Sequence, residues 1–250
     1  MVERRLITHY SNALQKEMKV LVYGRSGVPF LGFPTQDAMC DNYENFRMID
    51  TMSDDLERGR MQLFCVDSVD RESWSAKGGD GAARAWRQEQ YYHYIVDEVI
   101  PLISEINPSG ILPVPMGFSM GGSHAAIVFL RRPELFSGML AISGIYDADY
   151  FFDGYMDSVL YDSSPVHFLA NMPADHPYIP IYNSKEIIFC VGQGAWEDEG
   201  IRTLRRLQDI FHMKGIQAWT DFWGFDVNHD WPWWYKMVTY FLPRFLKLAD

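Results

Sequence analysis

The pentapeptide GFSMG, from Gly117 to Gly121, fits the nucleophile-elbow pattern Gly-x-Ser-x-Gly. In this pattern the serine sits in a sharp turn between a strand and a helix, and small neighbours let the two elements approach closely. The flanking sequence meets this demand, because the apolar run ILPVPMGF leads in and the small-residue run GGSHAAIVFL leads out. We therefore predict that Ser119 is a nucleophile for acyl transfer. A phosphate-binding role is disfavoured, since no Lys-Ser/Thr pair follows the glycines.

A serine nucleophile needs a histidine base, which follows the serine in chain order in this kind of site. His229 lies in the polar segment DVNHD, between a predicted strand at 217–223 and a predicted final helix. Polar residues in such a loop gather at the carboxyl ends of parallel strands. His212 falls inside a predicted helix at 199–214 and is expected on the surface, and Asp230 is better placed to cap the final helix. His229 is the predicted base.

The third member of such a site is a carboxylate that orients the histidine. Directly after the apolar strand EIIFCVG, the chain has the acidic residues Glu197, Asp198 and Glu199. Acidic residues at the start of a helix are also explained by the helix dipole, and one residue can serve both purposes. Position in the chain therefore leaves the choice among these carboxylates open.

Acyl transfer also needs hydrogen-bond donors for the oxyanion that develops during the reaction. The backbone N–H of Met120, next to the nucleophile, is the first predicted donor. The second is expected from the loop after the predicted strand at 29–33, where Pro34 has no N–H. Gln36 is therefore the second predicted donor, with Thr35 as the alternative.

Two other polar residues near this site are interpreted as structural. His124 lies on the helix behind Ser119 and is expected to be a buried histidine with its hydrogen bonds satisfied. Asp67 ends a strand at the same edge of the sheet but precedes the serine in the chain, so it is expected to fix a loop. The sequence has no His-Glu-x-x-His, paired-cysteine or calcium-loop pattern, so we expect no metal and no cofactor.

The elements that must position these residues alternate along the chain as strands and helices. Apolar runs predict strands at 19–23, 29–33, 61–66, 111–118, 138–143, 186–192 and 217–223. Helical periodicity predicts helices at 43–58, 86–105, 120–132, 199–214 and 232–248. The first two strands are expected to form a hairpin through the turn Gly24–Gly27. Repeated strand–helix units predict an α/β fold with a mostly parallel central sheet and helices on both faces.

Residues 145–185 form the longest stretch without this alternation. Because no linker divides the chain, we predict a single domain over 1–250 with 145–185 as a covering, lid-like insertion. The insertion is rich in aromatic residues. Those expected to shape an apolar acyl pocket are Tyr146, Tyr150, Phe151, Phe152 and Tyr155.

Charge and composition disfavour several other classes of protein. The 250 residues include 33 acidic and 22 basic side chains, and the net charge of -11 disfavours binding to nucleic acids or anionic membranes. The amino-terminal segment lacks the apolar core of a signal peptide, and no apolar run reaches the roughly 18 residues that a membrane-spanning helix needs. The 3 cysteines are scattered and make no disulfide framework. A cytoplasmic protein with a small-molecule partner is expected, with assembly into homo-oligomers left open.

The sequence resembles the Putative esterase family of α/β-hydrolases, which includes esterase D (S-formylglutathione hydrolase), feruloyl and acetylxylan esterases, enterochelin esterase and the mycolyltransferases. The resemblance spans nearly the whole chain and is carried by FPTQ, FCVDSVDRESW, GFSMGGSHA, VGQGAWEDE and DVNHDWPWW. It implies the α/β-hydrolase fold, Ser119 as nucleophile, His229 as base, and Glu197 or Asp198 as acid. The family usually has His-Gly where this chain has Pro34-Thr35, which bears on the oxyanion donor but leaves a backbone donor available.

These observations together predict a serine carboxylesterase that hydrolyses small acyl esters through an acyl-enzyme intermediate. Glu197 is favoured over Asp198, because the family's acid follows its glycine after a short loop and Glu197 is the first carboxylate after Gly194. Two alternatives stay open. One is an acyltransferase on the same scaffold, and the other is a catalytically silent binding protein that has kept the fold.

Overall fold

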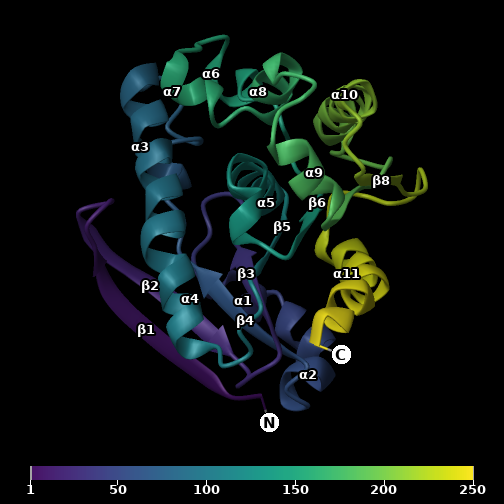
Figure 1. Cartoon of the computed structure of the whole chain (residues 1–250). Helices are drawn as coiled ribbons and strands as arrows, with labels where there is room; N and C mark the ends of the chain where they lie inside the picture. Colours follow the sequence, from purple (N-terminus) through teal and green to yellow (C-terminus); the bar gives the residue numbers. More distant parts are fainter. Residues whose placement is uncertain (1, 250) are drawn as a thin grey trace.

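The computed structural model describes residues 2–249, which form an eight-stranded sheet in the order β1-β2-β4-β3-β5-β6-β7-β8 (Figure 1). The strands are β1 (Arg4–Ser11), β2 (Lys16–Tyr23), β3 (Val28–Phe33), β4 (Met61–Val66), β5 (Val114–Phe118), β6 (Gly138–Ile142), β7 (Glu186–Val191) and β8 (Trp219–Phe222). β2 pairs antiparallel with both β1 and β4, and the other neighbours in the sheet pair parallel. The predicted α/β fold with a mostly parallel sheet is confirmed.

Helices cover both faces of this sheet. They are α1 (Asn42–Asn45), α2 (Met48–Glu57), α3 (Gly81–His93), α4 (Ile100–Ile106), α5 (Met120–Arg131), α6 (Asp149–Phe152), α7 (Ser158–Tyr161), α8 (Pro165–Asn171), α9 (Tyr178–Asn183), α10 (Asp198–Lys214) and α11 (Trp231–Leu246). A π-helical segment, Tyr94–Val99, joins α3 to α4, and short 3₁₀ helices lie at Asp70–Glu72, Pro133–Leu135 and Lys247–Ala249. Within 2–249, none of the helices combines the length and apolar character needed to cross a membrane.

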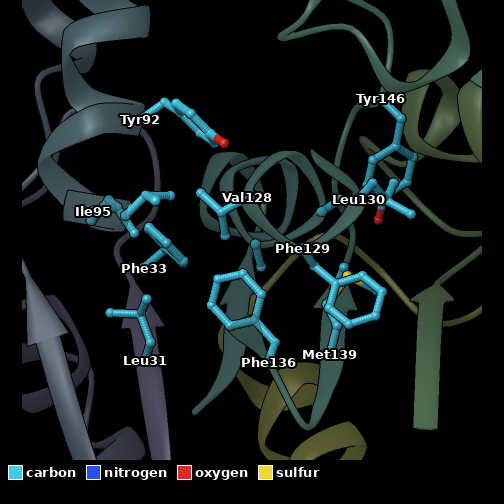
Figure 2. Packing of buried hydrophobic residues seen from close by; sticks show 14 of the residues in the cluster. Leu31, Phe33, Tyr92, Ile95, Val128, Phe129, Leu130, Phe136, Met139 and Tyr146 are labelled. Carbon is cyan, nitrogen blue, oxygen red and sulfur yellow. The ribbon is translucent and has the colours of Figure 1, made fainter. Parts of the chain in front are cut away.

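Two large apolar clusters hold the helices against the sheet. On one face, Figure 2 shows Val128, Phe129 and Leu130 of α5 packed among residues of the sheet and of the helical segment after α3. On the other face, α2 and α11 bury Met52 and Phe241. The central strands are covered on both sides, which explains why their sequences are apolar throughout rather than alternating.

The predicted hairpin between 19–23 and 29–33 is wrong. β2 pairs with β1 and β4, whereas β3 lies between β4 and β5. No strand is predicted at 4–11, because RRLITHYS is largely polar, as suits a strand whose side chains are mostly exposed. Proximity in the chain favours a hairpin between β2 and β3, but the long-range parallel pairing of β3 with β4 prevails.

Two predicted helices have different boundaries in the structure. The helix expected at 43–58 is divided into α1 and α2, because Arg47 adopts a left-handed conformation with φ 59°. The helix expected at 86–105 begins earlier, at Gly81, where the Asp80 carboxylate accepts a hydrogen bond of 2.9 Å from the Ala83 N–H and caps the helix. Its π-helical segment runs into α4, where Pro101 lacks the N–H that a regular α-helical turn would use.

Candidate active site

Ser119 lies in the turn between β5 and α5, where the motif predicts it. Its backbone has φ 55° and ψ -127°, a combination that is unfavourable for a residue with a side chain. The Ser119 N–H donates to the Ile142 carbonyl over 3.0 Å, and the Ser119 carbonyl accepts from the Gly122 N–H over 2.9 Å. The backbone on both sides therefore holds the serine in its strained conformation.

The two glycines of the motif are required by close packing. A Cβ atom on Gly117 would lie 2.2 Å from the backbone of Gly121, and a Cβ atom on Gly121 would lie 2.4 Å from the Phe33 carbonyl oxygen. Neither contact is sterically allowed. Glycine at both positions thus lets the start of α5 approach β5 and the end of β3, which brings Ser119 close to the loop that follows β3.

His229 and Glu197 meet at the same edge of the sheet as Ser119. His229 follows β8 and Glu197 follows β7, and Nδ1 of His229 donates to Oε2 of Glu197 over 2.9 Å. The Glu197 side chain is 0% exposed, whereas the His229 side chain is 22% exposed. The imidazole therefore has one nitrogen fixed by a buried carboxylate while the ring keeps contact with solvent.

The other carboxylate oxygen of Glu197 is bonded within the protein. Oε1 accepts a hydrogen bond of 2.6 Å from the Ser143 hydroxyl and a longer one of 3.4 Å from the Gly192 N–H. The Ser143 hydroxyl in turn accepts from Nε1 of Trp234 over 3.1 Å. Ser143 follows β6 directly and has φ 53°, so a second strained serine lies at this edge of the sheet. These donors give Oε1 of the buried carboxylate two hydrogen-bond partners.

The loops that carry Glu197 and His229 are joined by main-chain hydrogen bonds. The Gly194 N–H donates to the Val227 carbonyl over 2.8 Å, and the His229 N–H donates to the Ala195 carbonyl over 3.0 Å. The Ala195 N–H is bonded to the Asn228 side chain over 2.8 Å. Glu197 and His229 are therefore held in one hydrogen-bonded unit rather than on two independent loops.

Trp234 of α11 connects this unit to the serine turn. Its ring stacks on Phe118, the residue before Ser119, with ring centroids 5.5 Å apart. The same ring meets His229 edge-on, with centroids 5.1 Å apart. The indole thus packs against both sides of the site, and its N–H also supports Ser143.

Two backbone N–H groups are available for an oxyanion. Within residues 2–249, neither the Met120 N–H nor the Gln36 N–H donates a hydrogen bond. The Thr35 N–H, the alternative donor, is occupied, since it donates to the Asn42 side chain over 3.0 Å. Of the two donors considered in this loop, only Gln36 thus keeps a free N–H.

The other polar residues named in the sequence analysis lie on the surface or bind backbone N–H groups. Asp198 is exposed and begins α10, and His212 is exposed on the same helix. Asp230 caps α11 by accepting the Trp231 N–H over 2.7 Å, as predicted. Asp67 fixes a loop, as predicted, because its carboxylate accepts the N–H groups of Lys19 and Cys40.

The aromatic residues expected to shape an acyl pocket have divergent positions. Tyr146 is 1% exposed and lies in the core against Phe189, near Leu130 (Figure 2), so it does not line an open pocket. Phe151 and Phe152 are also buried, where they pack edge-on against Trp74. Tyr150 is exposed. Tyr155 is partly buried, and its hydroxyl donates to Asp157 over 2.7 Å.

The segment 145–185, predicted to be a covering insertion, is anchored to the body of the protein. Its helices α6 and α7 lie beside the amino end of α3 (Figure 1), whereas α8 packs against α10 and α5. Arg84 of α3 is buried and donates to the carbonyl groups of Ser73, Trp74 and Phe151, each over 2.9 Å. Burial of this guanidinium lowers the pKa of Arg84. A buried cation that binds main-chain carbonyls fixes α6 against the loop after β4.

Other side chains that could take part in chemistry are buried in an unreactive form or already paired. Burial raises the pKa of the Cys40 thiol to about 12, and it raises the pKa of Cys65 and Cys190 well above the ordinary value. These cysteines are therefore poor nucleophiles. Asp147, Asp149 and His167 bring potential metal-ligating atoms within 4.8 Å of one another. Arg206 is only 3.0 Å from the Asp147 carboxylate, and its charge opposes a bound cation.

The residues that support the site are not evident from the sequence. Ser143 donates to Glu197, Trp234 donates to Ser143, and Asp70 binds His124, in each case through side chains far apart in the chain. Ser143 carried one usable signal, because a polar residue directly after a buried strand lies at the edge where the other site residues gather. Trp234 and Asp70 carried none, since their partners are determined by tertiary contacts.

The parallel sheet, the strained serine after β5 and the carboxylate and histidine after β7 and β8 define the α/β-hydrolase class of fold. A family comparison identifies the protein more closely. Residues 11–244 match the family described as Putative esterase, and the chain belongs to that family. The predicted family and the predicted enzyme class, a carboxylic ester hydrolase, are both confirmed.

Solved structures with the same fold include esterases and a serine hydrolase. A ferulic acid esterase superposes with a TM-score of 0.75 at 16% identity, covering 99% of both chains. FphF, a fluorophosphonate-binding serine hydrolase of Staphylococcus aureus, gives 0.73 at 12% identity over 98% of both chains. The S-formylglutathione hydrolase FrmB of the same organism gives 0.71 at 13% identity over 98% of this chain and 97% of its own. No curated protein sequence matches the chain.

Proposed function

We propose that the protein is a serine carboxylesterase in which Ser119 is the nucleophile, His229 the base and Glu197 the carboxylate that orients the base. The observation that carries this proposal is the 2.9 Å hydrogen bond between His229 and Glu197, at the sheet edge that also holds the strained Ser119 turn. Because Nδ1 donates to the carboxylate, Nε2 is left as an acceptor for the serine proton. Asp198 is exposed at the start of α10 and is not assigned a part in the reaction.

In the proposed reaction, Nε2 of His229 takes the hydroxyl proton while Oγ of Ser119 attacks the ester carbonyl. The N–H groups of Met120 and Gln36 donate to the oxyanion of the tetrahedral intermediate. His229 then gives its proton to the departing alcohol, which leaves an acyl group on Ser119. Water, deprotonated by His229, attacks this acyl-enzyme and releases the acid. Glu197 stays ionised throughout and stabilises the imidazolium form of the base.

We propose small acyl esters as the substrates. Met120 follows Ser119 directly and belongs to a buried apolar cluster that also contains Trp74, Phe151 and Phe152. Large rings therefore fill space next to the nucleophile, which supports a short acyl group rather than a long one. The alcohol part of the ester is not assigned.

Labelling with a fluorophosphonate probe tests the nucleophile directly. The wild-type protein is expected to be labelled at Ser119, and Ser119→Ala to be unlabelled, folded by circular dichroism and lower in kcat on nitrophenyl acetate by at least about a thousandfold. An unlabelled wild-type protein would support a catalytically silent binding protein instead. A Ser119→Ala variant that keeps more than a tenth of the activity would overturn the assignment.

A series of nitrophenyl esters from acetate to octanoate tests the substrate class. If the buried rings limit the acyl site, kcat/KM should fall as the acyl chain lengthens, and KM should account for most of the change. A rise in kcat/KM toward octanoate would contradict the assignment of short acyl groups, while leaving the nucleophile assignment intact.

A further inference from the structure

The proposed mechanism does not use the buried pair formed by His124 and Asp70. Nε2 of His124 donates to Oδ1 of Asp70 over 2.8 Å, and the two side chains are 1% and 0% exposed. The rings of Phe33, Trp74 and Tyr91 surround the imidazole, with centroids 5.8, 6.3 and 5.1 Å away. Burying such a pair has a desolvation cost, and apolar side chains would fill the space at least as well. Its presence calls for a reason other than stability.

The second oxygen of Asp70 reaches the loop after β3. Oδ2 of Asp70 accepts the Asp37 N–H over 3.3 Å. Asp37 belongs to a tight turn in which the Ala38 N–H donates to the Thr35 carbonyl over 3.1 Å, and its φ of 61° is unfavourable for a residue other than glycine. A turn with this strain persists only where surrounding groups hold it. Asp70 is one of the groups that do so.

This turn carries the second proposed oxyanion donor. The peptide unit that contains the Gln36 N–H also contains the Thr35 carbonyl, and that carbonyl is bound by Ala38. The direction of the Gln36 N–H is therefore set by the geometry of the turn. The Gln36 side chain adds a second connection to the segment after β4, because its Nε2 donates to the Ser75 hydroxyl over 2.8 Å.

The first proposed donor belongs to the other element that Asp70 binds. The Met120 N–H lies at the start of α5, and His124 lies on the same helix. One carboxylate thus holds the helix that presents Met120 through Oδ1, and the turn that presents Gln36 through Oδ2. No other side chain in residues 2–249 bonds to both His124 and the Asp37 N–H.

We infer that the His124–Asp70 pair positions the oxyanion hole by fixing the distance and orientation between the Met120 and Gln36 N–H groups. The inference rests on the proposed function. His124 and Asp70 touch neither the substrate nor Ser119, so they are positioning residues. Donors placed for the oxyanion stabilise the transition state more than the bound ester, and a small displacement weakens that effect. Loss of the pair should therefore lower kcat and leave KM nearly unchanged.

The decisive variants are His124→Phe and His124→Gln. Phenylalanine fills the space among the surrounding rings but cannot donate to Asp70, whereas the glutamine amide can reach the position of Nε2. We expect His124→Phe to lower kcat by about ten- to a hundredfold, with KM within about threefold, since outright removal of an oxyanion donor costs about 10²–10³. Affinity for a trifluoromethyl ketone, which adds to Ser119 and places an oxyanion in the hole, should weaken by a similar factor. His124→Gln should recover most of both.

Tyr91→Phe is the matched control. It removes a buried hydrogen bond of 2.9 Å to the Asp67 carbonyl from the same cluster of rings, without touching Asp70. It should lower the Tm and leave kcat and the ketone affinity unchanged. Wild-type values of kcat and ketone affinity in His124→Phe, or an equal loss in Tyr91→Phe, would overturn the inference.

Fluorophosphonate labelling of the wild-type protein distinguishes failure of the proposed function from failure of the positioning role of His124 and Asp70. If Ser119 is not labelled, the proposed function fails. If Ser119 is labelled and His124→Phe is unchanged, only the positioning role fails. Should His124→Phe not fold, His124→Asn replaces it, because its shorter amide falls short of Asp70 and it must then differ from His124→Gln in kcat for the inference to hold.

Discussion

Two histidine–carboxylate pairs lie on opposite sides of the Ser119 turn, and they differ in exposure far more than in bond length. The pair of His229 and Glu197 measures 2.9 Å, and the pair of His124 and Asp70 measures 2.8 Å. His229 reaches solvent, whereas His124 is enclosed by aromatic rings. The two pairs also bind through different ring nitrogens, Nδ1 in the first and Nε2 in the second.

Under the proposed function, this difference separates a reactive pair from a structural one. In the pair of His229 and Glu197, the histidine is the partner that reaches solvent, and the nitrogen opposite the carboxylate makes no hydrogen bond within residues 2–249. In the buried pair, the carboxylate rather than the histidine reaches outward, to the Asp37 N–H. The same two side-chain types therefore suit two roles. In the proposed function His229 transfers protons, whereas the carboxylate of Asp70 binds the backbone N–H of Asp37. Histidine and carboxylate in contact are thus insufficient evidence for a catalytic base.

The largest expected effect comes from the partly exposed His229. His229→Ala should lower kcat by about a thousandfold or more with the fold intact, since the base is lost. The double variant with Ser119→Ala should lose little more than either single variant, because nucleophile and base act as a unit. Steady-state kinetics of the three proteins checks this. Additive losses in the double variant would mean that the two residues act independently.

The carboxylate partner of this pair comes next. Glu197→Gln should lower kcat by several hundredfold or more, because the base loses the charge that orients it and stabilises its protonated form. Asp198→Asn is the matched control, since its carboxylate is exposed at the start of α10, and it should stay within a few fold of wild type. The reverse ranking in kcat would move the acid to Asp198.

A smaller effect is expected from the hydroxyl that supports the acid. Ser143→Gly removes a 2.6 Å hydrogen bond to Glu197, while glycine tolerates the φ of 53° better than serine does. We expect kcat to fall by about tenfold without loss of thermal stability. Ser163→Ala is the control, because it removes a buried hydroxyl that has no hydrogen-bond partner within 2–249. Equal kcat in both variants would show that the Ser143 hydroxyl does not support the proposed role of Glu197.

The smallest effect tests how far the buried region extends toward the substrate. The ring of Trp74 meets both His124 and Phe151, so the rings of the covering segment continue the cluster around the buried pair. Replacing Phe151 and Phe152 with alanine should open space beside Met120 and lower KM for longer acyl esters by a few fold. Measured chain-length profiles identical to wild type would mean that these rings stabilise the core without limiting the substrate.

The sequence predicts the central strands and the serine turn well, because they depend on local signals. A short apolar run such as MQLFCV favours a strand covered on both faces, and the glycines around Ser119 require a close approach of backbones. The edge of the sheet could not be predicted in this way. β1 is largely polar, and β2 pairs with β1 and β4 rather than with β3.

In the candidate site, too, local signals predict some residues, whereas tertiary packing determines the contacts of others. Ser119, Met120 and His229 have positions that follow from strand ends and chain order. The contacts of Glu197 with Ser143, and of Asp70 with Asp37, each join residues more than thirty positions apart. Such contacts follow from packing, and spacing in the chain does not reveal them. Tyr146 was wrongly predicted for a similar reason, since a large apolar side chain serves a core as readily as a pocket.

The joined loops after β7 and β8 have a consequence for synthesis of the protein. Ser119 and its turn are synthesised more than 100 residues before His229 and Trp234. Under the proposed function, a nascent chain that has not yet reached His229 holds the serine without its base. Hydrolytic activity should therefore appear only after the loops that follow β7 and β8 have joined.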